Sequence, residues 1–247
     1  MKLTVLTLFP ESLTSMLEAS ILGRARKDGK LTVDAVDMRA FSTNKHRTVD
    51  DSPAGGGAGM VLRVDVVAAA IESVAGAHTI LVDARGKVFA QADAKRLAAM
   101  EHVAIVCGRY EGIDARAFDL VEEVVSLGDY VLTGGELAAL VILDATARLL
   151  PGVLGNADSS VHESHSEGLL EHRHYTRPTA FLGRAIPPVL LGGNHKDIDR
   201  ARRKDALVVT AQRRPDLLAT AQLSKSDDEL LADARVPTLA PHKEIGA

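Results

Sequence analysis

A series of short strand-like runs, some alternating and some continuously apolar, is separated by stretches of helical periodicity and constrains the fold more than any other feature. The runs occupy residues 2–9, 31–38, 78–84, 102–108 and 122–128. The runs at 78–84 and 102–108 have continuous apolar centres, which is typical of strands covered on both faces of a sheet. Strands that alternate with helices favour parallel pairing, because each helix returns the chain to the edge where the strand began. The sequence therefore predicts an α/β fold with a mostly parallel sheet.

Helices are expected between these runs, at residues 11–27, 64–76, 91–100 and 135–150. The last of these is long and apolar, and a Pro-Gly pair ends it. After Gly155 the chain becomes polar and reads as a linker. Beyond the linker we expect a short extended piece at 186–191 and helices at 195–209 and 214–221. The predicted organisation is a domain over 1–158, a flexible linker over 159–174 and a smaller helical domain over 175–247.

The formal charge is −4, but it is unevenly distributed. Between Arg173 and Arg214 there are ten Lys and Arg against three Asp, which gives about +7 locally and about −11 elsewhere. A basic segment on an acidic body favours binding of a polyanion such as nucleic acid. The alternative interpretation is a solvated helix face.

Composition excludes several classes of protein. A single cysteine, Cys107, rules out an internal disulfide framework and suits a reducing compartment. No apolar run approaches the roughly 18 residues that a membrane-spanning helix needs. The N-terminal apolar run is too short for a signal peptide. We therefore expect a cytoplasmic protein with no membrane partner.

Three loops carry more glycine than turns require, at residues 54–60, 107–114 and 126–136. The first fits neither G-x-G-x-x-G nor the P-loop, so it does not indicate a nucleotide site. The other two leave strands, and open α/β sheets bind ligands at the carboxyl ends of strands. Glycine there lets the backbone approach a ligand closely and read the edge of an adenine. Ordinary tight turns are the alternative interpretation.

Eight motifs occur together in one order: LFPE, HRTVDDSPAGGGAGM, CGRYEGID, GDYVLTGGE, PGVLG, HYTRP, PPVLLGGNH and RRPDLL. From residue 1 to about residue 220 the chain resembles the bacterial tRNA (guanine-N1)-methyltransferases of the TrmD type, a SPOUT-class family. The resemblance implies methyl transfer from S-adenosylmethionine to N1 of guanosine 37, the nucleotide 3′ of the tRNA anticodon. It further implies a parallel sheet with a deep trefoil knot, a small mainly helical C-terminal domain and a homodimer with a shared active site.

The same resemblance assigns residues that bind the methyl donor. They belong to the end of the third strand run and to two of the glycine loops: Val82, Asp83, Ala84, Gly86, Gly108, Leu127, Gly128, Asp129, Tyr130, Val131, Leu132, Gly134 and Gly135. It also implies a need for Mg²⁺, although the sequence shows no preformed set of ligands for this ion.

The chemistry follows from the reacting groups. A sulfonium methyl is already electrophilic, whereas guanine N1 carries a proton at neutral pH and is a poor nucleophile. A carboxylate can take that proton as general base, and a cation should stabilise the charge that develops on O6. By resemblance the carboxylate is Glu163, where relatives carry an aspartate, and the cation is Arg148. Two alternatives for the base remain: Asp158, or a Glu163 that is only a solvated linker residue.

The resemblance also places residues on the RNA side. Tyr110 would stack on the flipped guanine and Glu111 would bind its edge, although core packing is an alternative for Tyr110. Further expected RNA contacts are Arg47, Asp50, Arg177, Arg202, Arg203, Arg213 and Arg214. Two other functions stay open, namely a SPOUT methyltransferase with another target and an RNA-binding module without activity.

The stretch VHESHSEG raises the possibility of a metal site. His162, Glu163 and His165 lie too close together in an irregular stretch to form a zinc site without a distant ligand, and no cluster of Cys or His elsewhere provides an obvious one. We therefore expect no metal there.

Overall fold

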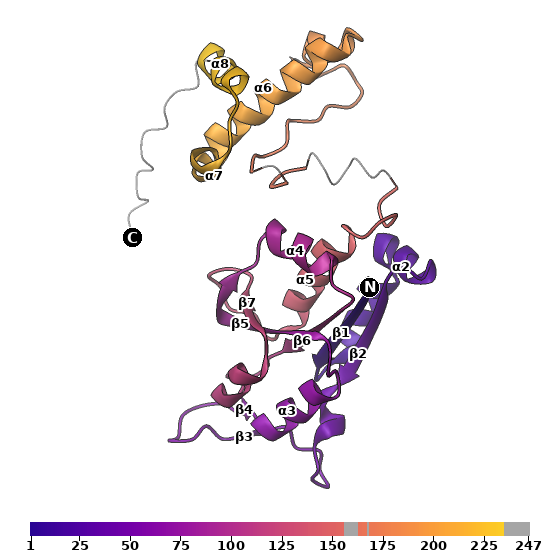
Figure 1. Ribbon diagram of the computed structural model, residues 1–247, viewed down its shortest axis with the longest axis vertical. Helices are drawn as coiled ribbons and strands as arrows, with labels where there is room; N and C mark the ends of the chain where they lie inside the picture. The colour runs from indigo at the N-terminus through magenta and orange to yellow at the C-terminus, as the bar shows by residue number, and fades with distance from the viewer. Residues whose placement is uncertain (156–162, 167, 235–247) are drawn as a thin grey trace. The chain divides into compact units, whose positions relative to one another are not determined.

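The computed structural model describes residues 1–155, 163–166 and 168–234 (Figure 1). The rival general base Asp158 lies outside these residues. Contacts divide the chain into two compact units, 1–157 and 158–247. Each unit has its own core, and each is described separately below.

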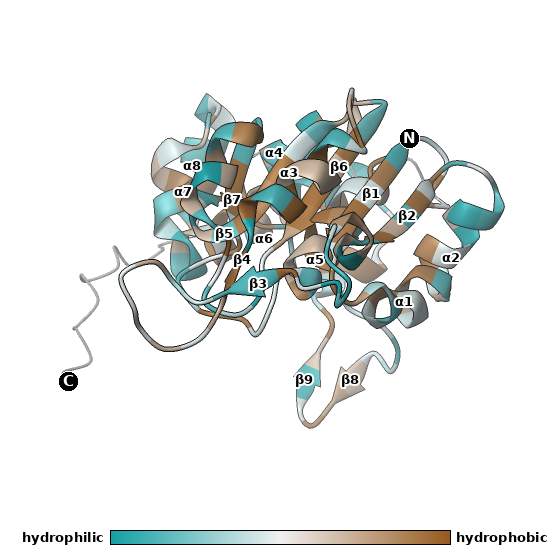
Figure 2. Ribbon diagram, turned by 90° about the horizontal axis from the view of Figure 1, so that it is seen from below, coloured by the Kyte–Doolittle hydropathy of each residue, from teal (hydrophilic) through white to brown (hydrophobic). Residues whose placement is uncertain are grey.

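The first unit is built on a five-stranded sheet. Its strands, in chain order, are β1 (Lys2–Thr7), β2 (Thr32–Asp37), β5 (His78–Val88), β6 (His102–Cys107) and β7 (Glu123–Ser126). They lie side by side in the order β2-β1-β6-β5-β7, and every neighbouring pair is parallel. The prediction of an α/β fold with a parallel sheet is confirmed. The inner strands β1, β6 and β5 are the most hydrophobic part of this unit (Figure 2), because both of their faces are covered.

Helices cover both faces of the sheet (Figure 1). One face packs against α1 (Thr14–Glu18), α2 (Ser20–Lys27), α4 (Gln91–Ala98) and α5 (Glu136–Ala147). The other packs against α3 (Val64–Glu72) and the 3₁₀ helices η2 (Met38–Phe41) and η3 (Ala115–Leu120). Alternate residues of a strand point to opposite faces, and accordingly Val5 belongs to the first core and Leu6 to the second. A small ladder joins β3 (Asp50–Asp51) to β4 (Val61–Leu62).

The single helix predicted for 11–27 is wrong in detail. The segment comprises the 3₁₀ helix η1 (Pro10–Leu13), α1 and α2, with a break at Ala19, which is extended at φ −90° and ψ 151°. Ser20 follows with a positive φ of 48°. Gly23 lies directly against the carbonyl of Glu18, where a side chain would collide. The chain therefore folds back on itself at the break, which a count of apolar spacing does not detect.

The second unit consists of α6 (His195–Arg213), α7 (Pro215–Thr220) and α8 (Lys225–Asp233), with a hairpin of β8 (Ala180–Phe181) and β9 (Arg184–Ala185) before them. Leu169, Leu207 and Leu230 form the centre of its small core. The extended piece predicted at 186–191 is wrong, because Pro188–Leu191 form a 3₁₀ helix, η5. Proline is favoured in a first helical turn, where its missing N–H is not needed. No helix among the described residues is long and apolar enough to cross a bilayer.

Candidate functional site

Two of the predicted glycine loops meet at the carboxyl ends of the strands. β5 lies between β6 and β7, so the chain that leaves β7 must cross the end of β5 to reach the loop after β6. There Arg109 and Gly134 form an antiparallel bridge, and the N–H of Gly135 donates to the carbonyl of Gly108 at 2.9 Å. The two loops are therefore joined by backbone hydrogen bonds.

Gly135 is required by close packing rather than by its backbone angles. A Cβ at this position would lie 2.7 Å from both Cα of Cys107 and Cγ2 of Val82. Its absence allows the first turn of α5 to rest directly on the ends of β5 and β6. The glycine thus fixes where the helix begins relative to the strand ends.

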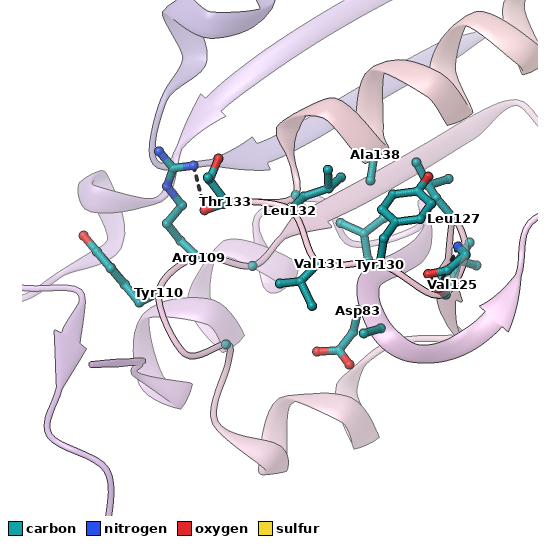
Figure 3. A pocket seen from close by; sticks show the side chains of 18 of the residues that line it. Asp83, Arg109, Tyr110, Val125, Leu127, Tyr130, Val131, Leu132, Thr133 and Ala138 are labelled. Atoms are coloured by element: carbon teal, nitrogen blue, oxygen red, sulfur yellow. Dashed lines mark hydrogen bonds between the residues drawn. The ribbon is translucent and has the colours of Figure 1, made fainter. Parts of the chain in front are cut away.

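A pocket of about 220 Å³ opens at this junction (Figure 3). Every residue to which the family resemblance assigns donor binding lines it, except Gly86 and Asp129. The lining also contains Arg109, Tyr110, Glu111, Gly112, Val125, Ser126, Thr133 and Ala138. Apolar side chains form one wall, while glycine loops present backbone groups. Such a mixture suits a small ligand with an apolar body and a few polar edges.

The end of β5 forms one wall through an interruption of the ladder. Pairing with β7 shifts register between Val82 and Lys87, so the intervening residues leave the ladder. The carboxylate of Asp83 accepts hydrogen bonds from the backbone and guanidinium of Arg85, at 2.9 and 2.8 Å, and these bonds lower the pKa of Asp83. Gly86 was expected to bind the donor, but it packs against β7 instead. A Cβ at this position would lie 2.5 Å from backbone atoms of Val125.

Sequence reasoning missed a polar cluster at the base of the pocket. Arg109 donates to the carbonyl of Thr133 at 2.9 Å (dashed in Figure 3) and lies 3.6 Å from the carboxylate of Glu136. Its guanidinium also lies over the ring of Phe9, at 4.5 Å from the centroid. Glu136 is 7% exposed and accepts a 2.7 Å hydrogen bond from the hydroxyl of Thr7. An acid in the first turn of a helix beside a glycine loop was the available signal.

Cys107 lies beneath the same loops but does not belong to the chemistry. It is 1% exposed, and burial, together with the nearby Glu136, raises the pKa of its thiol well above the ordinary value. A thiol held protonated is a poor nucleophile.

Tyr110 and Glu111 also line the pocket. Tyr110 is 51% exposed, has a positive φ of 59° and points away from the other labelled side chains in Figure 3. Core packing, the alternative for this tyrosine, is therefore wrong. The N–H of Glu111 donates to the carbonyl of Met60 at 3.0 Å, and its side chain packs on Gly59. The glycine loop 54–60 thus lies beside Glu111, whereas Arg47 and Asp50 do not line the pocket.

The remaining predicted residues lie elsewhere. Arg148 is the C-cap residue of α5, at the end of the helix opposite to the pocket. In the second unit Glu163 lines a separate pocket of about 400 Å³, together with Glu171, His172 and Arg202.

The predicted arginines of the second unit differ in their partners. Arg203 binds Asp227 with two hydrogen bonds of 2.7 and 2.9 Å, and Arg214 binds Asp216. Arg177, Arg202 and Arg213 form no ion pair with any residue that the structure describes. Among the predicted RNA contacts, these three are the cations of α6 and the preceding segment that are available to another molecule.

Comparison with known proteins gives one consistent family. The family model described as tRNA (Guanine-1)-methyltransferase TrmD matches residues 1–220. A tRNA (guanine-N(1)-)-methyltransferase from Pediococcus pentosaceus is 51% identical over 245 residues, which cover 97% of this chain and 100% of the relative. Relatives with the same name from Myxococcus xanthus and Agrobacterium fabrum are each 52% identical, over 92% and 90% of this chain and 94% and 97% of their own lengths. The chain belongs to the tRNA (guanine-1)-methyltransferase family of the TrmD type.

Proposed function

We propose that this protein transfers the methyl group of S-adenosylmethionine to N1 of guanosine 37 in tRNA. The observation that carries the proposal is the pocket at the junction of the two glycine loops, in a chain that belongs to this family. Its walls come from the loops in which the sequence places donor binding. The apolar lining suits the adenosine and methionine stem, and backbone N–H and C=O groups suit the adenine edge.

The shape of the pocket fits a ligand that is only partly enclosed. Its volume of about 220 Å³ lies below the roughly 300 Å³ at which ligand sites of drug size begin. Val131 on its rim is 91% exposed and Tyr130 is 55% exposed. A further surface that covered these side chains would complete the pocket.

When bound, the donor supplies a methyl group on a sulfonium, which is electrophilic without a metal. The residues of this chain then have two tasks. Glu163 takes the proton from guanine N1 as general base, and Arg148 stabilises the negative charge that develops on O6. Tyr110 and Glu111, beside the pocket, hold the target base by stacking and by its edge. Glutamate is one methylene longer than aspartate, so the geometry of proton removal is displaced and the rate is expected to be sensitive to it.

The length of α5 supports a homodimer with a shared site. Gly135 at its beginning lines the pocket, while Arg148 caps its other end. Thirteen residues at 1.5 Å each place these two positions about 20 Å apart, far beyond the length of an arginine side chain. Arg148 therefore cannot serve the pocket at the beginning of its own helix. It can serve the pocket of a second copy.

An exposed apolar surface is available for that second copy. Leu137 and Val141 are one helical turn apart on the outer face of α5 and are 59% and 48% exposed. They form an apolar strip on the helix whose beginning lines the pocket. A contact that buried this strip would also cover the open side of the pocket.

Several finer properties belong to the same proposal. The crossing of the chain from β7 past β5 to the loop after β6 is the kind of path that a trefoil knot needs. The second unit would bind the anticodon arm through phosphates, with Arg177, Arg202 and Arg213 as the principal contacts. We place the reaction in the cytoplasm, where its substrate is found. The described residues gather no cluster of oxygen ligands at the pocket that would suit Mg²⁺, so no step is assigned to this ion.

The test is the Glu163→Gln variant, assayed with a tRNA that carries guanosine at position 37. We expect methyl transfer to fall by about 10²–10⁴-fold, the usual contribution of a general base, while calorimetry shows unchanged donor affinity. The matched control is Glu171→Gln, a second carboxylate of the same pocket. Turnover like that of the wild type in Glu163→Gln would remove Glu163 from the mechanism. Donor and tRNA binding without methyl transfer in the wild type would instead favour an inactive RNA-binding module.

A further inference from the structure

The second unit contains a cluster of side chains that the proposed methyl transfer does not use. Glu171, His172 and His174 each offer one ligand atom, and these atoms lie within 4.8 Å of one another. The imidazole of His174 lies 2.8 Å from the carboxylate of Glu171, and the two imidazole rings are 4.6 Å apart between centroids. In the part of the chain that the structure describes, this is the one such group of three.

The backbone that carries the cluster is fixed to α6 on both sides. The N–H of Leu170 donates to the hydroxyl of Thr210 at 2.9 Å, and the N–H of Arg173 donates to the carboxylate of Asp205 at 2.7 Å. The N–H of Glu171 is also bound, to the hydroxyl of Ser164 at 2.9 Å. These bonds hold the backbone of the segment in place on α6 and on Ser164. The imidazoles of His172 and His174 therefore lie close together before any ligand binds.

We propose that Glu171, His172 and His174 form a binding site for a divalent transition-metal ion of the Zn²⁺, Co²⁺ and Ni²⁺ class, completed by water. Two imidazoles and one carboxylate are a donor set that zinc sites with an open position use. Ligand bonds of about 2.0–2.1 Å in a tetrahedron place donor atoms roughly 3.3 Å apart. The donor atoms of Glu171 and His174 are already 2.8 Å apart, and no separation within the group exceeds 4.8 Å, so movements of about 1.5 Å reach that value.

The donor set also excludes the hard cations. Imidazole suits Zn²⁺, Ni²⁺ and Co²⁺, whereas Mg²⁺ and Ca²⁺ prefer oxygen ligands. The nearby charges are compatible with a cation, because Arg173 is neutralised by its bidentate pair with Asp205. Arg202 and Arg203 both line a pocket with Glu171 and His172. Arg203 is paired with Asp227, so Arg202 is the stronger opposition to binding. The inference does not depend on the proposed methyl transfer.

The experiment titrates the metal-free full chain with Zn²⁺ against a chromophoric chelator. We expect one site per chain, with affinity reduced at least tenfold in His172→Ala and in His174→Ala and lost in the double variant. The matched control is His195→Ala, an exposed histidine at the start of α6, which should bind as the wild type does. His174 is itself exposed, so its replacement leaves the core of the unit intact. Circular dichroism verifies that each variant is folded.

A second measurement uses Co²⁺ as a spectroscopic probe. The visible absorption of Co²⁺ bound to the wild type should disappear in the double variant and persist in His195→Ala. An excess of Mg²⁺ should not displace the bound Co²⁺. The proposal is overturned if the wild type binds no Zn²⁺, if the double variant binds it with unchanged affinity, or if Mg²⁺ displaces Co²⁺.

Discussion

The buried carboxylate of Glu136 offers a direct test of how the pocket is held together. It accepts a hydrogen bond from Thr7 and faces the guanidinium of Arg109 at 3.6 Å, while Arg109 in turn binds the carbonyl of Thr133. Glu136→Gln keeps the shape of the side chain and an oxygen that accepts from Thr7. It removes the negative charge that holds Arg109. The variant therefore separates the charge from the packing.

The magnitude follows from the distances. Two unit charges 3.6 Å apart attract by about 4–5 kcal/mol at an effective dielectric constant of 20. Most of that attraction is offset by the cost of burying the carboxylate. The hydrogen bond from Thr7 is worth about 1.5–3 kcal/mol while Glu136 is charged and about 1 kcal/mol once its acceptor is a neutral amide. We expect Glu136→Gln to lower the free energy of unfolding by about 2 kcal/mol. Donor affinity should fall as well, because Arg109 lines the pocket.

Urea unfolding followed by circular dichroism measures the first effect, and calorimetry with S-adenosylmethionine measures the second. Thr7→Val is the matched comparison. It removes the hydrogen bond to Glu136 and the one that Thr7 Oγ1 accepts from the N–H of Phe9, but it leaves the pair between Arg109 and Glu136. It should cost about 1.5–3 kcal/mol of stability, the value of a hydrogen bond to a charged group, and leave donor affinity unchanged. Glu11→Gln, at an exposed acid, controls for loss of charge alone. A stability of Glu136→Gln within about 0.5 kcal/mol of the wild type, the scatter of ordinary surface substitutions, would refute the reasoning.

Three further predictions concern other parts of the molecule. Gly135→Ala places a Cβ 2.7 Å from two neighbouring atoms. It should lower the free energy of unfolding by about 1–3 kcal/mol and abolish donor binding measured by calorimetry. Gly155→Ala, whose Cβ would meet open space, should change neither. Asp227→Asn should lower stability to urea by about 2 kcal/mol at pH 7. The hydrogen bonds from Arg203 hold the pKa of Asp227 low. The stability that this pair contributes is therefore present above the unfolded pKa of about 3.9 and is lost as the pH falls through the native pKa. The difference in stability between variant and wild type should shrink below about pH 4. Leu137→Lys should shift the protein from dimer to monomer in analytical ultracentrifugation, and an unchanged dimer would exclude this face of α5 from the interface.

Much of the first unit could be predicted because two of its inner strands, at residues 78–84 and 102–108, are continuous apolar runs. Those runs specify burial on both faces, and burial on both faces specifies a parallel sheet with helices above and below. The break between α1 and α2 could not be predicted, because its apolar spacing continues through Ala19 and the backbone turns there for reasons of local packing. The helix α8 was also missed. Its capping box of Ser224 and Asp227 was the available signal.

The candidate site also has a part that could be predicted and a part that could not. The loops that form the pocket were identified because each combines glycine with the end of a strand, and strand ends meet at one edge of a parallel sheet. The bond between Thr7 and Glu136 joins residues 129 positions apart and depends on β1 lying next to β6. Nothing local in the sequence specifies that neighbourhood. The polar support of a site is therefore harder to predict than its backbone frame.

The charge of the second unit shows how a count along the sequence can mislead. The basic stretch from Arg173 to Arg214 stops short of Asp216, Asp227 and Asp233, which pair with Arg214, Arg203 and Lys204. Over residues 158–247 there are thirteen Lys and Arg and thirteen Asp and Glu, so the unit as a whole is formally neutral. The distinctive feature of the second unit is the position of its unpaired cations, which lie on α6 and on the segment before it. Attraction to a phosphate backbone then depends on a few arginines rather than on the net charge of the unit. Binding should therefore depend on where the phosphates of the partner lie relative to these arginines, more than on how densely the partner is charged.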